Sequence, residues 1–156
     1  MKTELLLVGK TTNKHIAALL DLYTRRITRY MPFAVTVIPE LKNTKSLSEE
    51  QQRQREGRLI LRHLQPADTL VLLDERGKEL RSIELAQWLT QKQLVARRLL
   101  LAIGGPYGFS GEVCQRANEK LSLSRLTFSH QTVRAILAEQ IYRACTIIKG
   151  EPYHHE

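Results

Sequence analysis

Three short runs of almost unbroken apolar residues constrain the fold of this chain more than any other feature. They are TELLLVG at the N-terminus, Leu70–Leu73 and Leu99–Ile103. A strand that is apolar on both sides has to be covered on both faces, as strands of a parallel sheet are. Segments with helical spacing separate these runs. The chain is therefore predicted to form an α/β domain with a mainly parallel sheet and helices on both faces.

Periodicity and helix-start signals place the other elements. Ser48 is an N-cap candidate ahead of Gln51 in a capping-box arrangement, so a helix is expected to begin there. Alternation from Phe33 to Pro39 predicts a strand that the proline ends. The predicted helices are Lys14–Arg29, Ser48–Leu64, Ser82–Leu94, 111–119 and Gln131–Ile148, and a brief strand is expected at 121–123.

The length of the chain fits one domain. Its 156 residues suit a single hydrophobic core, so residues 1–156 are predicted to form one unit. No apolar run approaches the roughly 20 residues that cross a bilayer, and we expect a cytoplasmic protein without membrane contact. Cys114 and Cys145 stand outside any CxxC or Cys/His spacing, which argues against a disulfide framework or a zinc site.

The balance of charged residues favours a polyanionic partner. The formal net charge is +8, from 24 Lys and Arg against 16 Asp and Glu. Neutralising phosphates releases condensed counterions, which favours binding of a basic protein to nucleic acid. A basic surface that serves only solubility would have the same composition, and charge does not distinguish RNA from DNA.

The segment VGKTT, from Val8 to Thr12, imitates a phosphate-binding loop. It follows a predicted strand, and LVLLDE at Leu70–Glu75 would complete an NTPase-like pair of motifs. A phosphate loop needs the pattern GxxxxGK[ST], because main-chain N–H groups must wrap around the phosphates. Glu4 stands where the first glycine is required, and its carboxylate would repel phosphate, which argues against an NTPase.

A glycine-rich loop, IGGPYGFSG, runs from Ile103 to Gly111 after the most apolar predicted strand. Ligands of open α/β sheets bind at the carboxyl ends of the strands. Glycines allow the backbone to approach a ligand that a Cβ atom would obstruct. The loop lacks the GxGxxG spacing of a dinucleotide site, and a turn that only requires glycine dihedral angles explains it equally well.

Small hydroxyl residues alternate with apolar ones in LSLSRLTFSHQ, from Leu121 to Gln131. Hydroxyl groups and main-chain amides of this segment could face a flat heterocycle, with the apolar side chains around it. A simpler interpretation is a short strand followed by a helix N-cap at Ser129. The hydroxyl positions are Ser122, Ser124 and Thr127, and the apolar positions are Leu123, Leu126 and Phe128.

The last predicted helix and the tail carry side chains able to contact RNA. Tyr, His and Arg stack on bases and bind phosphates, although a lone Arg on a helix is usually just solvated. Adjacent histidines point apart, and no Asp, Glu or Cys stands beside them at ligand spacing, so no metal site is expected. The residues concerned are Arg134, Glu139, Tyr142, Arg143, Tyr153, His154 and His155.

Several motifs together resemble the large-subunit ribosomal RNA methyltransferase family called RlmH. They are LLLVG, LLDERGK, LLAIGGPYG, LSLSRLTFSHQTVR, LAEQIYRA and GEPYHHE, in order and spacing over essentially the whole chain. The resemblance implies a SPOUT α/β-knot fold with a deep trefoil knot. It also implies a homodimeric enzyme that transfers a methyl group from S-adenosylmethionine to N3 of a pseudouridine in large-subunit (23S) ribosomal RNA, either free or in the assembled ribosome.

The same resemblance implies roles for particular residues. The tail of family members contributes to the substrate site, which makes Arg143, Tyr153 and His154 candidate RNA contacts. Ser129 departs from the family, in which proline often precedes the histidine, and this puts the stiffness of that loop in question. The residues implied in methyl-donor binding are Leu73, Gly104, Leu123, Ser124, Arg125, Leu126, Thr127 and Phe128.

The implied reaction sets what the site must provide. The sulfonium of the donor already makes its methyl group electrophilic, so the enzyme mainly aligns the nucleophile and excludes water, without a metal. N3 of pseudouridine must lose a proton, which calls for a base or a positive field. His130 or His154 could accept the proton. The field could come from Arg134, Arg143 or His154, and Tyr153 completes the candidate catalytic residues together with Arg143, His154 and His130.

Two other functions fit the same features. A noncatalytic ribosome- or RNA-binding factor would use the basic surface without a methyl donor. A SPOUT methyltransferase could also act on another RNA, such as tRNA. Binding of S-adenosylmethionine distinguishes the enzyme from the first alternative, and mapping of the modified base distinguishes it from the second.

Overall fold

A computed structural model describes residues 1–156 and contains one five-stranded sheet with the strand order β2-β1-β4-β3-β5. All neighbouring strands in the sheet are parallel. The strands are β1 (Lys2–Val8), β2 (Phe33–Ile38), β3 (Thr69–Glu79), β4 (Arg98–Ile103) and β5 (Glu119–Ser122). The helices are α1 (Lys14–Ile27), α2 (Glu49–His63), α3 (Ser82–Val95), α4 (Gly111–Arg116) and α5 (Thr132–Ile148), and a short 3-10 turn, η1, spans Thr44–Ser46.

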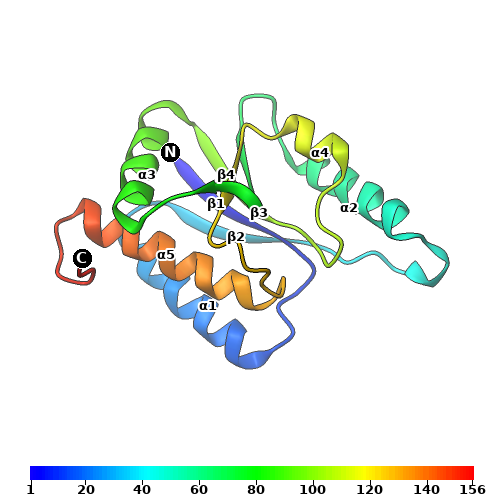
Figure 1. Cartoon of the computed structure of the whole chain (residues 1–156), viewed down its shortest axis with the longest axis horizontal. Coiled ribbons are helices and arrows are strands. Elements are labelled where there is room, and N and C mark those ends of the chain that lie inside the picture. Colours follow the sequence, from blue (N-terminus) through cyan, green and yellow to red (C-terminus); the bar gives the residue numbers. More distant parts are fainter.

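Helices cover both faces of the sheet, as Figure 1 shows: α1, α3 and α5 lie on one side and α2 and α4 on the other. Successive side chains of one strand serve the two faces. In β1, Leu5 and Leu7 pack in the cluster with α1, α3 and α5, whereas Leu6 and Val8 pack in the cluster with α2 and α4. Strands buried on both faces explain the unbroken apolar runs, and the predicted α/β architecture is confirmed. The trefoil knot implied by the resemblance stays a prediction.

Local signals set where the helices begin. Ser48 caps α2 in a capping box with Gln51, as predicted, and Asn13 and Ser110 cap α1 and α4 with their side-chain oxygens. Predicted and observed ends differ by a few residues, because the last turn of a helix depends on tertiary contacts more than on periodicity. No helix combines the length and apolar character that a bilayer crossing requires.

Strand β3 departs from regular pairing in a way that shapes the site. Its register against β5 shifts between Leu73 and Lys78, so the four residues from Asp74 to Gly77 leave the regular ladder. A Cβ atom on Gly77 would lie 2.8 Å from the main-chain carbons of Lys120 and Leu121, so only glycine fits there. The sequence pattern predicted only the apolar first part of this strand.

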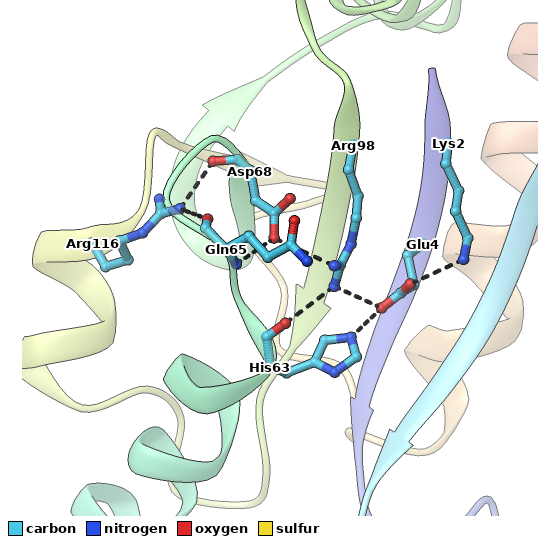
Figure 2. A network of polar contacts seen from close by, with 7 residues as sticks. All are labelled: Lys2, Glu4, His63, Gln65, Asp68, Arg98 and Arg116. Atoms are coloured by element: carbon cyan, nitrogen blue, oxygen red, sulfur yellow. Dashed lines mark hydrogen bonds and ion pairs between the residues drawn. The ribbon is translucent and has the colours of Figure 1, made fainter.

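A polar network closes the amino-terminal edge of the sheet (Figure 2). Glu4 of β1 is only 3% exposed, and its carboxylate is hydrogen-bonded to His63 and lies 3.5 Å from the Arg98 guanidinium. Asp68 lies 3.6 Å from the same guanidinium. Burial acts to raise the pKa of Glu4, but the hydrogen bond from His63 and the charges of Arg98 and His63 outweigh it, so the pKa is lowered.

This network predicts acid-sensitive stability. A depressed carboxyl pKa contributes stability that is complete above the unfolded-state pKa and is lost as the pH falls through the folded-state value. The Glu4→Gln variant is expected to be less stable than the wild type by about 1–3 kcal/mol at neutral pH. The difference should shrink below about pH 4. Urea unfolding from neutral pH to below about pH 4 measures the stability difference and its pH dependence, with Glu112→Gln as the exposed control. A stability difference that stays constant with pH would contradict the lowered pKa of Glu4.

Candidate functional site

A cavity of about 400 Å³ opens at the carboxyl ends of β3, β4 and β5. Three segments form most of its wall: the part of β3 that leaves the ladder, the glycine-rich loop after β4 and the loop after β5. Single residues of α2, α4 and α5 complete it. Parallel strands bring these ends to one edge of the sheet, which is where open α/β sheets bind ligands. The volume suits a small-molecule ligand.

Most residues implied in donor binding meet in this cavity. Arg125 is the exception, because its side chain is 89% exposed and lies 3.7 Å from Glu79, outside the cavity wall. Leu126 lines the cavity yet is 73% exposed, which places an apolar side chain at the mouth. The residues that line the cavity are Leu73, Gly104, Leu123, Ser124, Leu126, Thr127 and Phe128.

The glycine-rich loop forms a tight turn over the cavity. The Gly108 N–H donates to the Gly105 carbonyl over 3.1 Å, and Gly108 has a φ of 78°, in the region that favours glycine. Arg53 of α2 donates to the Tyr107 carbonyl over 3.3 Å and so ties the loop to the helix beside it. The turn and its attachment to α2 define one wall of the cavity.

The loop after β5 is held by its own hydroxyl groups. The Ser122 hydroxyl donates to the Ser124 carbonyl over 2.7 Å, and Ser124 Oγ accepts from the Leu126 N–H over 3.0 Å. The Thr127 hydroxyl donates to Glu75 Oε2 over 2.5 Å and links this loop to β3. Ser129 Oγ accepts from the Thr132 N–H over 3.0 Å, but the residue at the N-cap of α5 is Gln131, so the N-cap expected at Ser129 was placed two residues too early. These hydroxyls fix the shape of the loop instead of pointing freely at a ligand.

Pattern analysis missed several residues of the cavity wall, among them Arg53, Tyr107 and Asp74. Burial acts to raise the pKa of Asp74, but hydrogen bonds from Arg76 outweigh it, so the pKa is lowered and the wall carries a negative charge. Tyr107 is 40% exposed beside the mouth. The only sequence signal for Asp74 and Tyr107 was their position within the motifs LLDERGK and GGPYG. No sequence signal indicated Arg53.

His130 lies in the cavity wall, directly before α5. Burial lowers the pKa of its imidazole and the charge of Arg134 lowers it further, against an opposing effect of Glu40. The ring is therefore neutral at neutral pH, and a neutral imidazole has one nitrogen free to accept a proton. Of the residues predicted to act in catalysis, His130 is the one that the fold places in the cavity.

Arg134 is completely buried, so the interpretation of this side chain as solvated was wrong. Its charge lowers the pKa of His130 in the cavity wall, and its role as a positive field for the substrate stays a prediction. Its guanidinium donates to the carbonyls of His130, Gly9 and Val8 over 2.9, 2.9 and 2.8 Å, and to the Thr11 hydroxyl over 2.9 Å. These bonds clamp the start of α5 to the end of β1. Helical spacing could not reveal this role, because the partners Val8, Gly9 and Thr11 are more than a hundred residues away in sequence.

The same bonds explain why the VGKTT segment is not a phosphate loop. Its carbonyls at Val8 and Gly9 are occupied by Arg134. The Gly9 N–H donates to the Ile38 carbonyl over 2.8 Å, and the Thr12 N–H donates to Gln131 Oε1 over 2.8 Å. Main-chain donors that are already bonded within the protein do not form a cradle for phosphate.

A second polar cluster lies at the far end of α5. Arg143 lies 2.6 Å from Glu139 Oε1 and 3.2 Å from His154 Nδ1, and its guanidinium stacks 4.7 Å from the Tyr153 ring centroid. The Tyr153 hydroxyl donates to Glu139 over 2.8 Å. Three of the predicted catalytic residues, Arg143, Tyr153 and His154, thus meet in one place, which we call the tail cluster together with Glu139.

The tail cluster and the cavity lie at opposite ends of one helix. Helix α5 has 17 residues. At the usual rise it is about 25 Å long. His130 precedes it and His154 follows it. Burial and the hydrogen bond to Glu139 raise the pKa of Tyr153, so its hydroxyl remains protonated and is a donor. Within a single chain the tail cluster does not reach the cavity.

No three or more His, Cys, Asp or Glu side chains are placed together to hold a metal ion. Cys145 is buried, and its pKa is raised to about 11 by burial, which makes this thiol unreactive. The side chains that line the cavity supply an imidazole, guanidinium groups, carboxylates, hydroxyl groups, a thiol and apolar groups.

Comparison with known proteins places the chain in a family. The sequence profile described as "Predicted SPOUT methyltransferase" matches residues 1–154. A relative from Bacteroides thetaiotaomicron, named "Ribosomal RNA large subunit methyltransferase H", is 57% identical over 157 residues and is aligned over 100% of both chains. A relative of the same name from Bacteroides fragilis is 54% identical, also over 100% of both chains.

A solved structure, titled "Structure of the putative methyltransferase Lpg2936 from Legionella pneumophila in complex with the bound cofactor SAM", aligns with a TM-score of 0.49 and 12% identity. The alignment covers 92% of this chain and 66% of that one. The family assignment rests on the profile match over residues 1–154 and on the identities of 57% and 54% to the two relatives. This chain belongs to the SPOUT methyltransferase family.

Proposed function

We propose that this protein is an S-adenosylmethionine-dependent methyltransferase that modifies N3 of a pseudouridine in large-subunit ribosomal RNA. One observation carries the proposal. Seven of the eight residues that the family resemblance links to the methyl donor, some of them distant in sequence, line one cavity at the carboxyl edge of the sheet. Relatives named as ribosomal RNA large subunit methyltransferase H are 57% and 54% identical over the full chain.

S-adenosylmethionine suits the three-walled cavity. Apolar side chains of Leu73, Leu123 and Phe128 would cover its adenine, and main-chain amides of the glycine-rich loop would bind its polar groups. When bound, the donor supplies an electrophilic methyl group. The remaining task of the protein is to hold the nucleophile in line and to exclude water.

His130 is the proton acceptor that we favour. Its ring is neutral and lies in the cavity wall. Both ring nitrogens of His154 already have partners, which makes His154 the weaker candidate. Its Nδ1 lies 3.2 Å from the Arg143 guanidinium, and its Nε2 lies 3.2 Å from Glu156. Removal of the N3 proton by His130 leaves an anion on the base, and the N3 lone pair then forms the bond to the methyl carbon as the bond from carbon to sulfur breaks.

The active site is completed by a second copy of the chain. Along α5, Arg143 of the tail cluster lies ten residues beyond Val133 of the cavity wall, which at the usual rise is about 15 Å. A homodimer in which each tail cluster faces the cavity of the partner would bring Arg143 and Tyr153 to the base that enters. Arg143 then supplies positive charge near the forming anion, and Tyr153 offers an aromatic face for stacking.

The polyanionic substrate agrees with the charge of the chain. A net charge of +8 favours association with ribosomal RNA or with the assembled ribosome through phosphate contacts. Such a substrate is found in the cytoplasm, which is the location that we propose.

Calorimetry with S-adenosylmethionine tests the donor site. The wild type is expected to bind one donor per cavity, and Gly104→Val should abolish binding. A Cβ atom at this position would already lie 3.3 Å from the Gly108 main chain, so the larger side chain of valine would displace the glycine-rich loop that lines the cavity. Arg125→Ala is the matched control, because its side chain points away. A wild type without donor affinity would instead support a noncatalytic RNA-binding factor.

The role of His130 predicts a pH-dependent loss of rate. His130→Ala is expected to lower the single-turnover rate of methyl transfer by about 100-fold or more, because a positioned base contributes roughly that factor. The wild-type rate should fall as the pH drops through the pKa of His130, which burial and the charge of Arg134 hold below its ordinary value. The variant should lose this dependence, whereas His154→Ala should keep it. An unchanged acidic limb in His130→Ala would rule out His130 as the base.

A further inference from the structure

Glu56 of α2 is a buried acid that the proposed reaction does not use. The residue is 5% exposed, and its Oε1 atom is buried without any hydrogen-bond partner. The other oxygen accepts from Gln52 Nε2 over 3.2 Å. Buried polar atoms are rarely left unpartnered, so this carboxyl group requires an explanation.

The carboxyl group of Glu56 lies directly behind the glycine-rich loop. A Cβ atom on Gly105 would be 2.8 Å from Glu56 Oε1 and 3.2 Å from Oε2, so the carboxyl group packs against the main chain of this residue. Gly105 lines the cavity, whereas Glu56 does not. The loop wall is therefore one residue thick here, with the ligand space in front of Gly105 and Glu56 behind it.

No positive charge faces Glu56. Gln52 on its own helix offers a neutral amide. Arg53 is engaged with Glu50 and with the Tyr107 carbonyl. From the segment after β2, Glu40 adds a negative charge that acts on Glu56. Burial raises the pKa of the Glu56 carboxyl, and Glu40 raises it further, although the hydrogen bond from Gln52 opposes this.

We propose that Glu56 is a positioning residue of the donor site, whose buried carboxyl group packs beneath Gly105 and keeps the glycine-rich loop in its donor-binding shape. The inference rests on the proposed function, because it takes the methyl donor as the ligand of the cavity. A neutral carboxyl fits a site without a counter-ion, whereas an ionised one requires water or donors. The glycine-rich loop in front of Glu56 is the element that would move to admit water or donors to an ionised carboxylate.

The sign of the pH dependence follows. Raising the pH through the elevated pKa of Glu56 ionises the buried group, loosens the loop and weakens donor binding. In that range donor binding would take up a proton, because the bound form prefers neutral Glu56. The dissociation constant should rise by up to about tenfold per pH unit above this pKa.

The test uses the Glu56→Gln variant of the full-length protein. Glutamine has the shape of a neutral glutamic acid and does not titrate. Calorimetry with S-adenosylhomocysteine, from about pH 5 to about pH 8, spans the range in which buried glutamates titrate. We expect the wild type to lose affinity as the pH rises and to take up protons on binding, and Glu56→Gln to lack both effects. Glu49→Gln, an exposed change on the same helix, should behave as the wild type.

Outcomes separate this inference from the proposed function. If the wild type and Glu56→Gln bind the probe with the same pH dependence, the role of Glu56 is refuted and the donor site stands. If no variant binds the probe, the donor site itself fails and this inference fails with it.

A second pair of variants covers the case in which Glu56→Gln does not fold. Gly105→Ala should weaken probe binding, because its Cβ meets Glu56 Oε1. Adding Glu56→Ala should recover part of the loss. Strictly additive losses would contradict a direct contact between the two positions.

Discussion

The Arg134→Ala variant is expected to lose about 3–5 kcal/mol of unfolding free energy, since buried carbonyls left without a donor each cost a large part of their desolvation energy. The guanidinium is fully buried and serves the carbonyls of Val8, Gly9 and His130. Alanine leaves all three without this donor and also leaves a void between β1 and α5. We expect the loop with His130 to lose its fixed position as well.

Urea unfolding followed by circular dichroism measures this loss. Arg125→Ala is the matched control, because its side chain is 89% exposed and its removal should change stability by less than about 0.5 kcal/mol. Arg134→Lys should fall between them, since an ammonium group cannot reproduce the fork of donors. A stability of Arg134→Ala close to that of the control would show that Arg134 does not clamp the helix to the strand.

The largest effect on activity is expected when the cavity and the tail cluster are disabled in different copies of the chain. Gly104→Val removes donor binding, and Arg143→Ala removes the guanidinium that binds Glu139, His154 and Tyr153. Each homodimer should lose about 100-fold or more in methyl transfer. A heterodimer of the two variants has one site with an intact cavity and an intact partner tail, so it should recover about half of the wild-type activity.

The matched control places both substitutions in one chain and pairs it with a wild-type chain. In a composite dimer each site then lacks either the cavity or the tail, and the heterodimer should be inactive. Two affinity tags allow both heterodimers to be purified and assayed with labelled S-adenosylmethionine. The reverse result, with activity only when both changes are in one chain, would show that each chain contains a complete site.

Local features of the sequence were sufficient to predict the elements. The capping box at Ser48 marked the start of α2, and the apolar runs marked β1, the first part of β3 and β4. These signals depend on neighbours within a few residues, and such contacts can be deduced from periodicity. The last helix, predicted over Gln131–Ile148, was also correct to within one residue.

Contacts between distant segments could not be predicted in the same way. Trp88 is buried and donates to Glu119 over 2.7 Å, yet nothing near Trp88 in sequence indicated this partner. In the sequence, the segment from Asp74 to Gly77 resembles an ordinary turn. Its departure from the ladder with β5 is decided by the pairing of the strands in the sheet. The burial of Arg134 and Glu56 depends on strands and loops that only the folded chain brings near. The donor residues were implied by the family resemblance, and patterns alone left them ambiguous.

Mapping the ribosomal RNA of a strain that lacks this gene tests the central claim most directly. Mass spectrometry of the large-subunit RNA should show one pseudouridine that has lost its N3 methyl group. The gene for the wild-type protein should restore the methyl group, whereas the Gly104→Val gene should not. Large-subunit RNA with the same methylation with and without the gene would contradict the account, and a methyl group missing from tRNA instead would assign the enzyme to another substrate.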